Sequence, residues 1–125
     1  MASTLMVVDD SKSSRKVNLA LVKELLGDSV ECLEATGGED ALAQLAKRSV
    51  DLVLLDLTMP GVSGFDVLTE LRRRQTSTRV IVVSADIQRQ AKERVASLGA
   101  TGFIEKPIKI EALRAMLTTL GVLHG

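Results

Sequence analysis

The chain has 125 residues, and its 16 basic and 16 acidic residues cancel, so no overall field favours a nucleic acid or an anionic membrane. Two Phe are the only aromatic residues, which excludes stacking platforms for single-stranded nucleic acid. A single cysteine (Cys32), a start without a basic n-region, and no apolar stretch of about 18 residues predict one soluble, cytoplasmic domain over residues 1–125.

Short apolar runs alternate with amphipathic stretches along the whole chain. The runs predict strands over Leu5–Val8, Val30–Ala35, Leu52–Leu55, Val80–Val83 and Gly102–Ile104. Apolar residues at helical spacing predict helices over Ser14–Leu26, Glu39–Ser49, Gly64–Arg74, Ile87–Leu98 and Ile110–Leu120. Strands that alternate with helices indicate right-handed βαβ crossovers, and therefore a parallel sheet with helices on both faces.

The apolar content of each run predicts its place in the sheet. Leu52–Leu55 and Val80–Val83 are continuously apolar, which favours central strands, whereas two glutamates interrupt Val30–Ala35 and favour an edge. Gly27 is predicted to end the first helix. The inward face of that helix is predicted to carry Val17, Leu21 and Leu25.

Polar residues stand where the predicted strands end. The first run ends in Asp9-Asp10, the third in Asp56 and the fourth in Ser84, and Lys106 follows the fifth. Ligands of such sheets bind beyond the carboxyl ends of the strands, so we expect three carboxylates, a hydroxyl and an ammonium to converge there. Carboxylates in excess need a counter-ion, and a set of oxygen ligands favours a hard divalent cation, Mg²⁺ more than Ca²⁺.

Each of these residues also has a purely structural interpretation. Asp10 could cap the first helix, Asp56 could turn the chain, and Ser84 could cap the fourth helix. A lone Lys-Pro pair is typical of a loop, and Phe103 could be ordinary core packing. Four such residues at the same end of one sheet are harder to explain as caps, which favours a functional site.

Several segments resemble the receiver domain of two-component response regulators. They are VVDDS, LVLLDLTMPGVSGFDVL, VIVVSA and GATGFIEKP, in this order and spacing, and EATGGEDAL resembles the family's second strand and the start of its second helix. The resemblance covers essentially the whole chain. It implies an α/β, flavodoxin-like fold: a doubly wound, five-stranded parallel sheet of order 2-1-3-4-5 with five helices.

The resemblance also implies the chemistry of the site. Asp56 would accept a phosphoryl group from the phosphohistidine of a sensor histidine kinase or a phosphotransfer protein. Mg²⁺ would be bound by Asp10, Asp56 and the backbone carbonyl of Thr58, with Asp9 acting through water. Positioning and charge neutralisation are what phosphoryl transfer requires, so the implied ligands agree with the chemistry.

Further residues receive roles from the same resemblance. Lys106 would neutralise one phosphoryl oxygen, and Ser84 would bond another and act as a switch together with Phe103. Thr58 and Asp86 would flank the path of hydrolytic water and so influence the lifetime of the phosphoryl group. The Lys106-Pro107 bond is predicted to be cis, a form that an X-Pro bond adopts at about 0.5–1 kcal/mol.

The sequence is therefore interpreted as a stand-alone response regulator that signals by phosphorylation-dependent binding of a target protein. It would catalyse its own phosphorylation and dephosphorylation but would not be a metabolic enzyme. The resemblance places the target face on the fourth helix, fifth strand and fifth helix, with Gln88, Lys92, Phe103, Lys109 and Arg114.

Other functions stay open. A phosphorelay shuttle or a phosphate sink would use the same fold. A small aspartyl-phosphate hydrolase would resemble the haloacid-dehalogenase superfamily, whose first strand ends in a DxD pattern that Asp9-Asp10-Ser11 lacks. A pseudo-receiver would bind partners without phosphate, and the presence of Asp10, Asp56 and Lys106 argues against it.

Overall fold

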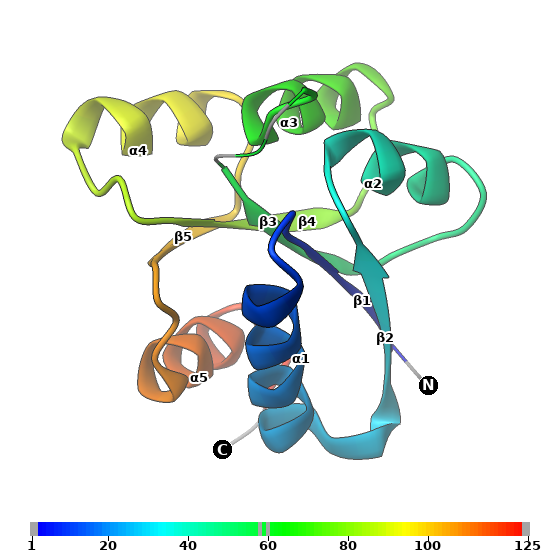
Figure 1. Cartoon of the computed structure of the whole chain (residues 1–125), viewed down its shortest axis with the longest axis vertical. Helices are drawn as coiled ribbons and strands as arrows, with labels where there is room; N and C mark the ends of the chain where they lie inside the picture. Colours follow the sequence, from blue (N-terminus) through cyan, green and yellow to red (C-terminus); the bar gives the residue numbers. More distant parts are fainter. Residues whose placement is uncertain (1–2, 58, 60, 124–125) are drawn as a thin grey trace.

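One parallel sheet in the order β2-β1-β3-β4-β5 forms the centre of the molecule (Figure 1). The computed structural model describes residues 3–57, 59 and 61–123. The strands are β1 Ser3–Val8, β2 Val30–Ala35, β3 Leu52–Asp56, β4 Arg79–Ser84 and β5 Gly102–Glu105. The helices are α1 Lys12–Leu26, the short 3₁₀ turn η1 Gly27–Ser29, α2 Gly38–Leu45, α3 Gly64–Arg73, α4 Arg89–Ser97 and α5 Ile110–Thr119. The predicted flavodoxin-like order is confirmed.

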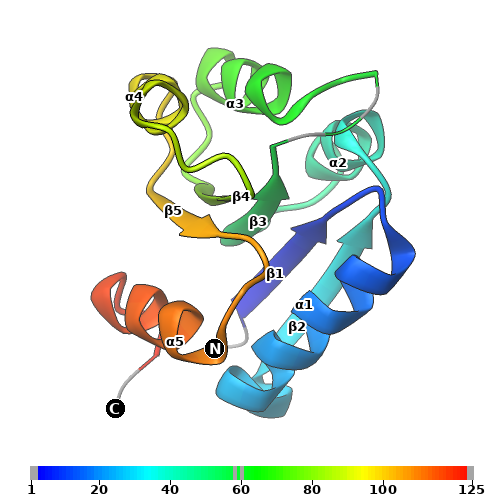
Figure 2. The same ribbon diagram turned by 60° about the vertical axis from the view of Figure 1, so that its left-hand side comes forward.

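Helices cover both faces of the sheet. Figure 2 shows α1 and α5 on one face and α2, α3 and α4 on the other. Alternate residues of each strand enter the two cores: in β1, Met6 and Val8 pack toward α2–α4, while Leu5 and Val7 pack toward α1 and α5. Burial on both faces explains why the inner strands β1, β3 and β4 contain continuous apolar runs.

The position of each strand matches its apolar content. All five residues of β3 are buried, and β1 and β4 lie on either side of it. β2, with its two glutamates, is an edge strand, and β5 forms the other edge. The predicted central and edge positions of the third, fourth and second runs are confirmed.

The prediction that Val17 lies on the inner face of α1 is wrong, because Val17 is 58% exposed. The buried residues of this helix are Arg15, Asn18, Leu19 and Val22, a stripe with the spacing of one helical face. Leu21 and Leu25 pack at the flank of this stripe and are partly buried. The error arose because two polar residues, one of them a buried arginine with partners of its own, occupy the core face.

Two other helix ends have clear local causes. Gly27, the predicted stop of α1, has a φ of 66°, a left-handed conformation that glycine adopts without strain. α2 ends at Leu45 rather than at the predicted Ser49. Residues 46–48 form turns, because Val50 must return to the core, where it is 4% exposed, before β3 begins.

The start of α3 lies against the end of β3. Ser63 caps the helix: its hydroxyl accepts the Asp66 N–H at 3.3 Å, and an Asp66 carboxylate oxygen accepts the Ser63 N–H at 3.0 Å. A Cβ on Gly64 would lie 2.8 Å from the backbone oxygen of Asp56. Only glycine allows this approach of α3 to the strand that carries Asp56.

Gly38, the first residue of α2, gives a prediction about the loop after β3. A Cβ on Gly38 would overlap the backbone oxygen of Val62, so Gly38→Ala must displace the loop or the helix. Overpacking of this kind costs about 1–3 kcal/mol, and we expect that loss in the free energy of unfolding measured by chemical denaturation.

The neighbouring Gly37 is the matched control for this prediction. A Cβ on Gly37 would meet nothing within 4 Å, and its φ of 175° is extended backbone. We therefore expect Gly37→Ala to change the free energy of unfolding by less than about 0.5 kcal/mol. Equal losses in the two variants would contradict the close contact at Val62.

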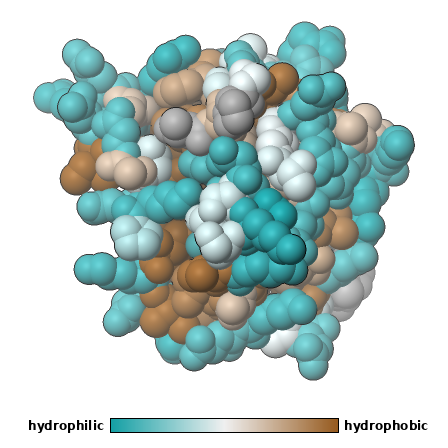
Figure 3. All heavy atoms as spheres, viewed as in Figure 1, coloured by the Kyte–Doolittle hydropathy of each residue, from teal (hydrophilic) through white to brown (hydrophobic). Residues whose placement is uncertain are grey.

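Hydrophilic side chains cover most of the face shown in Figure 3, and apolar atoms surface mainly in its lower part, over α1 and α5. Among the residues that the structure describes, no helix combines the length and the apolar character needed to cross a bilayer.

Candidate functional site

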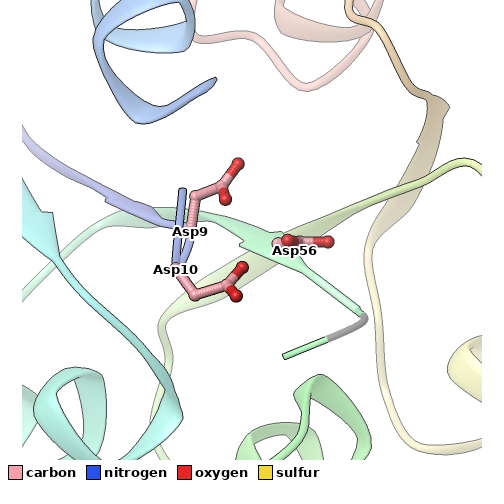
Figure 4. Close-up of side chains that lie close together, drawn as sticks. All are labelled: Asp9, Asp10 and Asp56. Carbon is pink, nitrogen blue, oxygen red and sulfur yellow. The ribbon is translucent and has the colours of Figure 1, made fainter. Parts of the chain in front are cut away.

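Three aspartates meet at the carboxyl end of the sheet. Asp9 and Asp10 follow β1, Asp56 ends β3, and one carboxylate oxygen from each lies within 4.8 Å of the others (Figure 4). Asp9 is 1% exposed and Asp56 is 6% exposed, whereas Asp10 lies at the surface. The adjacency of β1 and β3 in the sheet therefore produces the acidic cluster predicted from the sequence.

Asp9 is held by hydrogen bonds through its backbone and its side chain. Its N–H donates to the Ala35 carbonyl at 3.2 Å, extending the β1–β2 ladder. The Ser11 N–H donates to Oδ1 at 2.9 Å. Oδ2 accepts from the Ser14 hydroxyl at 2.6 Å and from Lys106 Nζ at 3.1 Å. Asp9 is thus a fixed anion at the base of the cluster.

The charges of Asp9 and Lys106 stabilise each other. Burial raises the pKa of Asp9, but hydrogen bonds from Ser14, Ser11 and Lys106 together outweigh it and lower the pKa below its usual value. Burial lowers the pKa of Lys106, yet its contacts with Asp9 and Asp56 outweigh that effect and raise it. Asp9 is therefore a carboxylate and Lys106 an ammonium at neutral pH.

Lys106 reaches the cluster from the end of β5. Its Nζ lies 3.1 Å from Asp9 Oδ2 and 3.5 Å from Asp56 Oδ2. Its backbone N–H donates to the Ser84 carbonyl at 2.9 Å, and the Lys106-Pro107 bond is cis, as predicted. The ammonium thus contacts two of the three carboxylates of the site.

Ser84 ends β4, which lies beside β3, the strand that ends in Asp56. Asp56 pairs in register with Val83, so Ser84 lies one residue beyond the neighbour of Asp56. Ser84 is 2% exposed, and its hydroxyl oxygen accepts the Asp86 N–H at 3.0 Å. The residue that precedes α4 as its N-cap is Gln88, so Ser84 is not the cap of this helix.

Asp10 is likewise not a helix cap. Ser11 caps α1, and its hydroxyl accepts the Ser14 N–H at 3.3 Å. Within the described part of the chain, no hydrogen bond to the Asp10 carboxylate is present. Figure 4 shows this carboxylate extending toward Asp56. The position suits a metal ligand, because its oxygens remain available to an incoming cation.

The remaining predicted residues lie around the cluster or outside the described chain. Phe103, on β5, is partly buried against the core under α2–α4, and Lys92 Nζ lies 5.6 Å from its ring centroid. Asp86 is exposed in the loop after β4. Thr58, predicted as a metal ligand and a lifetime residue, lies outside the described residues.

The donor set fits a hard divalent cation. All the candidate ligand atoms are oxygens, and the three carboxylates with one ammonium leave a formal charge of minus two. A divalent cation would neutralise that charge, and few protein ligands leave room for the waters that Mg²⁺ retains. The three carboxylates present therefore fit a hard divalent cation such as Mg²⁺.

Two residues of the site were not predicted from the sequence. Ser14 donates to Asp9, and Arg15 donates from Nη1 to the Asp9 backbone carbonyl at 2.8 Å. The burial of Arg15 could have been predicted, because Arg15 shares a helical face with Leu19 and Val22. A charged residue on that face, one turn after two aspartates, indicates a buried partner. The sequence holds no comparable signal for Ser14.

Comparison with known proteins agrees with this geometry. The chain matches the family described as response regulator receiver domain over residues 5–118. A solved structure of the Vibrio cholerae chemotaxis protein CheY4 covers 99% of this chain and is itself covered completely, with a TM-score of 0.83 and 26% identity.

Curated relatives are longer than this chain. The sensory/regulatory protein RpfC of Xanthomonas campestris is 36% identical over 122 residues, which are 94% of this chain and 16% of RpfC. The probable C4-dicarboxylate response regulator DctR of Bacillus subtilis is 31% identical over 90% of this chain and 50% of its own length. This chain therefore spans half or less of these two relatives. The matching family, the shared fold and the acidic cluster lead to one conclusion: the chain belongs to the receiver domain family of two-component response regulators.

Proposed function

We propose that Asp56 accepts a phosphoryl group from a phosphohistidine and that the phosphorylated protein signals by binding a target protein. Receiver domains bind Mg²⁺ at an acidic pocket and interact with histidine kinases or phosphotransfer proteins. The observation that carries the proposal is the convergence of Asp56 with Asp9, Asp10 and the Lys106 ammonium. The donor would be a sensor histidine kinase or a phosphotransfer protein.

The transfer step follows from these positions. A carboxylate oxygen of Asp56 forms a bond to phosphorus while the phosphorus–nitrogen bond to the donor imidazole breaks, and the leaving nitrogen keeps the electron pair. Bound Mg²⁺ would supply positive charge to the phosphoryl oxygens. Lys106, 3.5 Å from Asp56 Oδ2, places a second positive charge beside the acceptor. Asp9 holds this ammonium at 3.1 Å, so the charge is in place before the donor arrives.

The target face in this proposal is formed by α4, β5 and α5. Four of its predicted residues are exposed: Gln88, Lys92, Lys109 and Arg114. Phe103, on β5, is partly buried. Lys92 contacts the Phe103 ring, which links the surface of α4 to β5. Three cations on this face favour a partner surface with acidic residues. A phosphorelay shuttle or a phosphate sink would also accept the phosphoryl group on Asp56, but it would not need a target protein at this face.

The test begins with phosphoryl uptake. The protein is incubated with a small acyl phosphate, with Mg²⁺ or with a chelator, and its intact mass is measured. We expect one added phosphoryl group with Mg²⁺ and much less with the chelator. Phosphoryl uptake that is equal with and without Mg²⁺ would contradict the proposal, and so would the absence of uptake from any acyl phosphate. Turnover of a generic phosphate ester would instead favour the hydrolase.

Target binding is tested separately. Pull-downs with the phosphorylated and the unphosphorylated protein should recover a partner that prefers one state. The Asp56→Asn variant, treated with the same phosphate donor, is the matched control because it should behave like the unphosphorylated protein. A shuttle would transfer its phosphoryl group to a histidine of a second protein, and a sink would lose it without any partner.

A further inference from the structure

Arg15 is the only basic residue that is buried in the described part of the chain, with 8% of its surface exposed. It lies on the inner face of α1, one helical turn after the N-cap Ser11. Removing a charged group from water costs several kcal/mol unless the group is paired and hydrogen-bonded. The partners of Arg15 therefore indicate what its burial achieves.

The guanidinium of Arg15 connects α1 to the ends of two strands. Nε donates to Glu34 Oε1 at 2.9 Å, and Nη1 donates to the Asp9 backbone carbonyl at 2.8 Å. Glu34 is the penultimate residue of β2, and Asp9 directly follows β1, its neighbour in the sheet. The hydrogen bond from Arg15 lowers the pKa of Glu34, which therefore stays ionised beside the guanidinium.

The carbonyl that Arg15 binds belongs to the peptide between Asp9 and Asp10. A peptide is planar, so fixing its oxygen also fixes the direction in which the chain enters Asp10. The Asp9 N–H and both of its carboxylate oxygens already have donors or acceptors on other elements. The Asp10 carboxylate has no such contact within the described residues, so its direction depends on the backbone that carries it.

We propose that Arg15 is a positioning residue of the metal site: it orients the Asp9–Asp10 peptide so that the Asp10 carboxylate faces Asp56. This inference rests on the Mg²⁺ site of the proposed function. Residues that orient metal ligands through hydrogen bonds typically change metal affinity by about 10–100-fold. Arg15 would act in this way without touching the metal or the phosphoryl group.

The test compares Mg²⁺ affinity in Arg15→Gln and wild-type protein by isothermal titration calorimetry. We expect the Arg15→Gln dissociation constant to rise about tenfold. In the metal-free protein, the ¹³C shift of the Asp9 carbonyl should also move, because that carbonyl loses a charged donor. Lys16→Gln is the matched control, since Lys16 is exposed and its Nζ lies 3.6 Å from the same Glu34; both quantities should stay as in wild type.

Two further variants separate positioning from ordinary stabilisation. Glu34→Gln removes the ion pair but keeps the Arg15–Asp9 bond, so it should lower stability while Mg²⁺ affinity stays near the wild-type value. Arg15→Lys keeps the charge but has a single ammonium for two separated acceptors, so its affinity should fall between wild type and Arg15→Gln. It also replaces Arg15→Gln as the test if that variant fails to fold.

The outcomes distinguish this inference from the proposed function. Wild-type Mg²⁺ affinity in both Arg15 variants, or an unmoved Asp9 carbonyl shift, would overturn the positioning role alone. Equal losses of Mg²⁺ affinity in Glu34→Gln and Arg15→Gln would also overturn it, because the ion pair would then suffice as the cause. A wild-type protein that binds no Mg²⁺ would overturn the metal site itself.

Discussion

Asp56→Asn is expected to abolish phosphoryl uptake. The amide that replaces the carboxylate is a poor nucleophile and a weaker ligand for a divalent cation. Asp9 and Asp10 lie within the same cluster, yet Asp9 is fixed by Ser11, Ser14 and Lys106, so it is not expected to replace Asp56 as acceptor. Intact-mass measurement after incubation with an acyl phosphate and Mg²⁺ should show no added group.

Asp28→Asn is the control for this loss. Asp28 is exposed in η1, between α1 and the start of β2, so its replacement removes one carboxylate without touching the site. This variant should take up one phosphoryl group at the wild-type rate. If Asp56→Asn gains the same mass as wild type, another residue is the acceptor and the assignment of Asp56 is wrong.

The fold could be predicted because burial on both faces leaves a plain signal. Leu52–Leu55 and Val80–Val83 contain no polar residue, and both became inner strands of the sheet. Strand order is different, because periodicity does not distinguish the possible neighbours of a strand. It came from the family resemblance, and the structure confirms it.

The inner face of α1 could not be predicted by counting apolar residues. Val17 is apolar and exposed, whereas Arg15 and Asn18 are polar and buried. The burial of Arg15 depends on Glu34, 19 positions further along the chain, and on a backbone carbonyl that no side-chain pattern reveals. Local periodicity fails where a polar residue on the core face finds its partners through tertiary structure.

The convergence of the candidate site could be predicted from the sequence, whereas the contacts among its residues could not all be predicted. The common direction of parallel strands brings Asp9, Asp10, Asp56 and Lys106 to the same end of the sheet, and the sequence showed this. The family resemblance implies that Lys106 neutralises a phosphoryl oxygen, which stays a prediction. In the structure its ammonium contacts the carboxylates of Asp9 and Asp56, since these are the anions beside it.

Phosphorylation of Asp56 should be transmitted through Ser84. A phosphoryl group adds about one negative charge to the carboxylate it joins, together with strong acceptor oxygens. The Ser84 oxygen already accepts the Asp86 N–H at 3.0 Å, which leaves its O–H free to donate to such an oxygen. That bond would draw the end of β4 toward Asp56. β4 pairs with β5 from Ile81–Gly102 to Ser84–Glu105, with Phe103 opposite Val82, so the movement would reach Phe103.

Phe103 would respond by changing its packing. Its ring is partly buried against the core under α2–α4 and lies beside Lys92, so a shift inward would withdraw it from the surface that α4 and β5 present. Phe has no hydroxyl, so packing alone would hold the inward state. Two packings that differ by a few kcal/mol are enough for a switch, and the Ser84 bond would supply the difference in free energy between them.

Ser84→Ala should therefore separate phosphorylation from signalling. The variant keeps Asp56, Lys106 and the metal ligands, so it should still gain one phosphoryl group, but it lacks the donor that couples β4 to it. A hydrogen bond to a charged group contributes about 1.5–3 kcal/mol, so the change in target affinity on phosphorylation should shrink by roughly tenfold or more. Ser84→Thr keeps the hydroxyl and should retain most of that change. Titration of the target with each variant, phosphorylated and unphosphorylated, measures this change in affinity. If Ser84→Ala shows the same change in target affinity as wild type, the signal does not pass through Ser84.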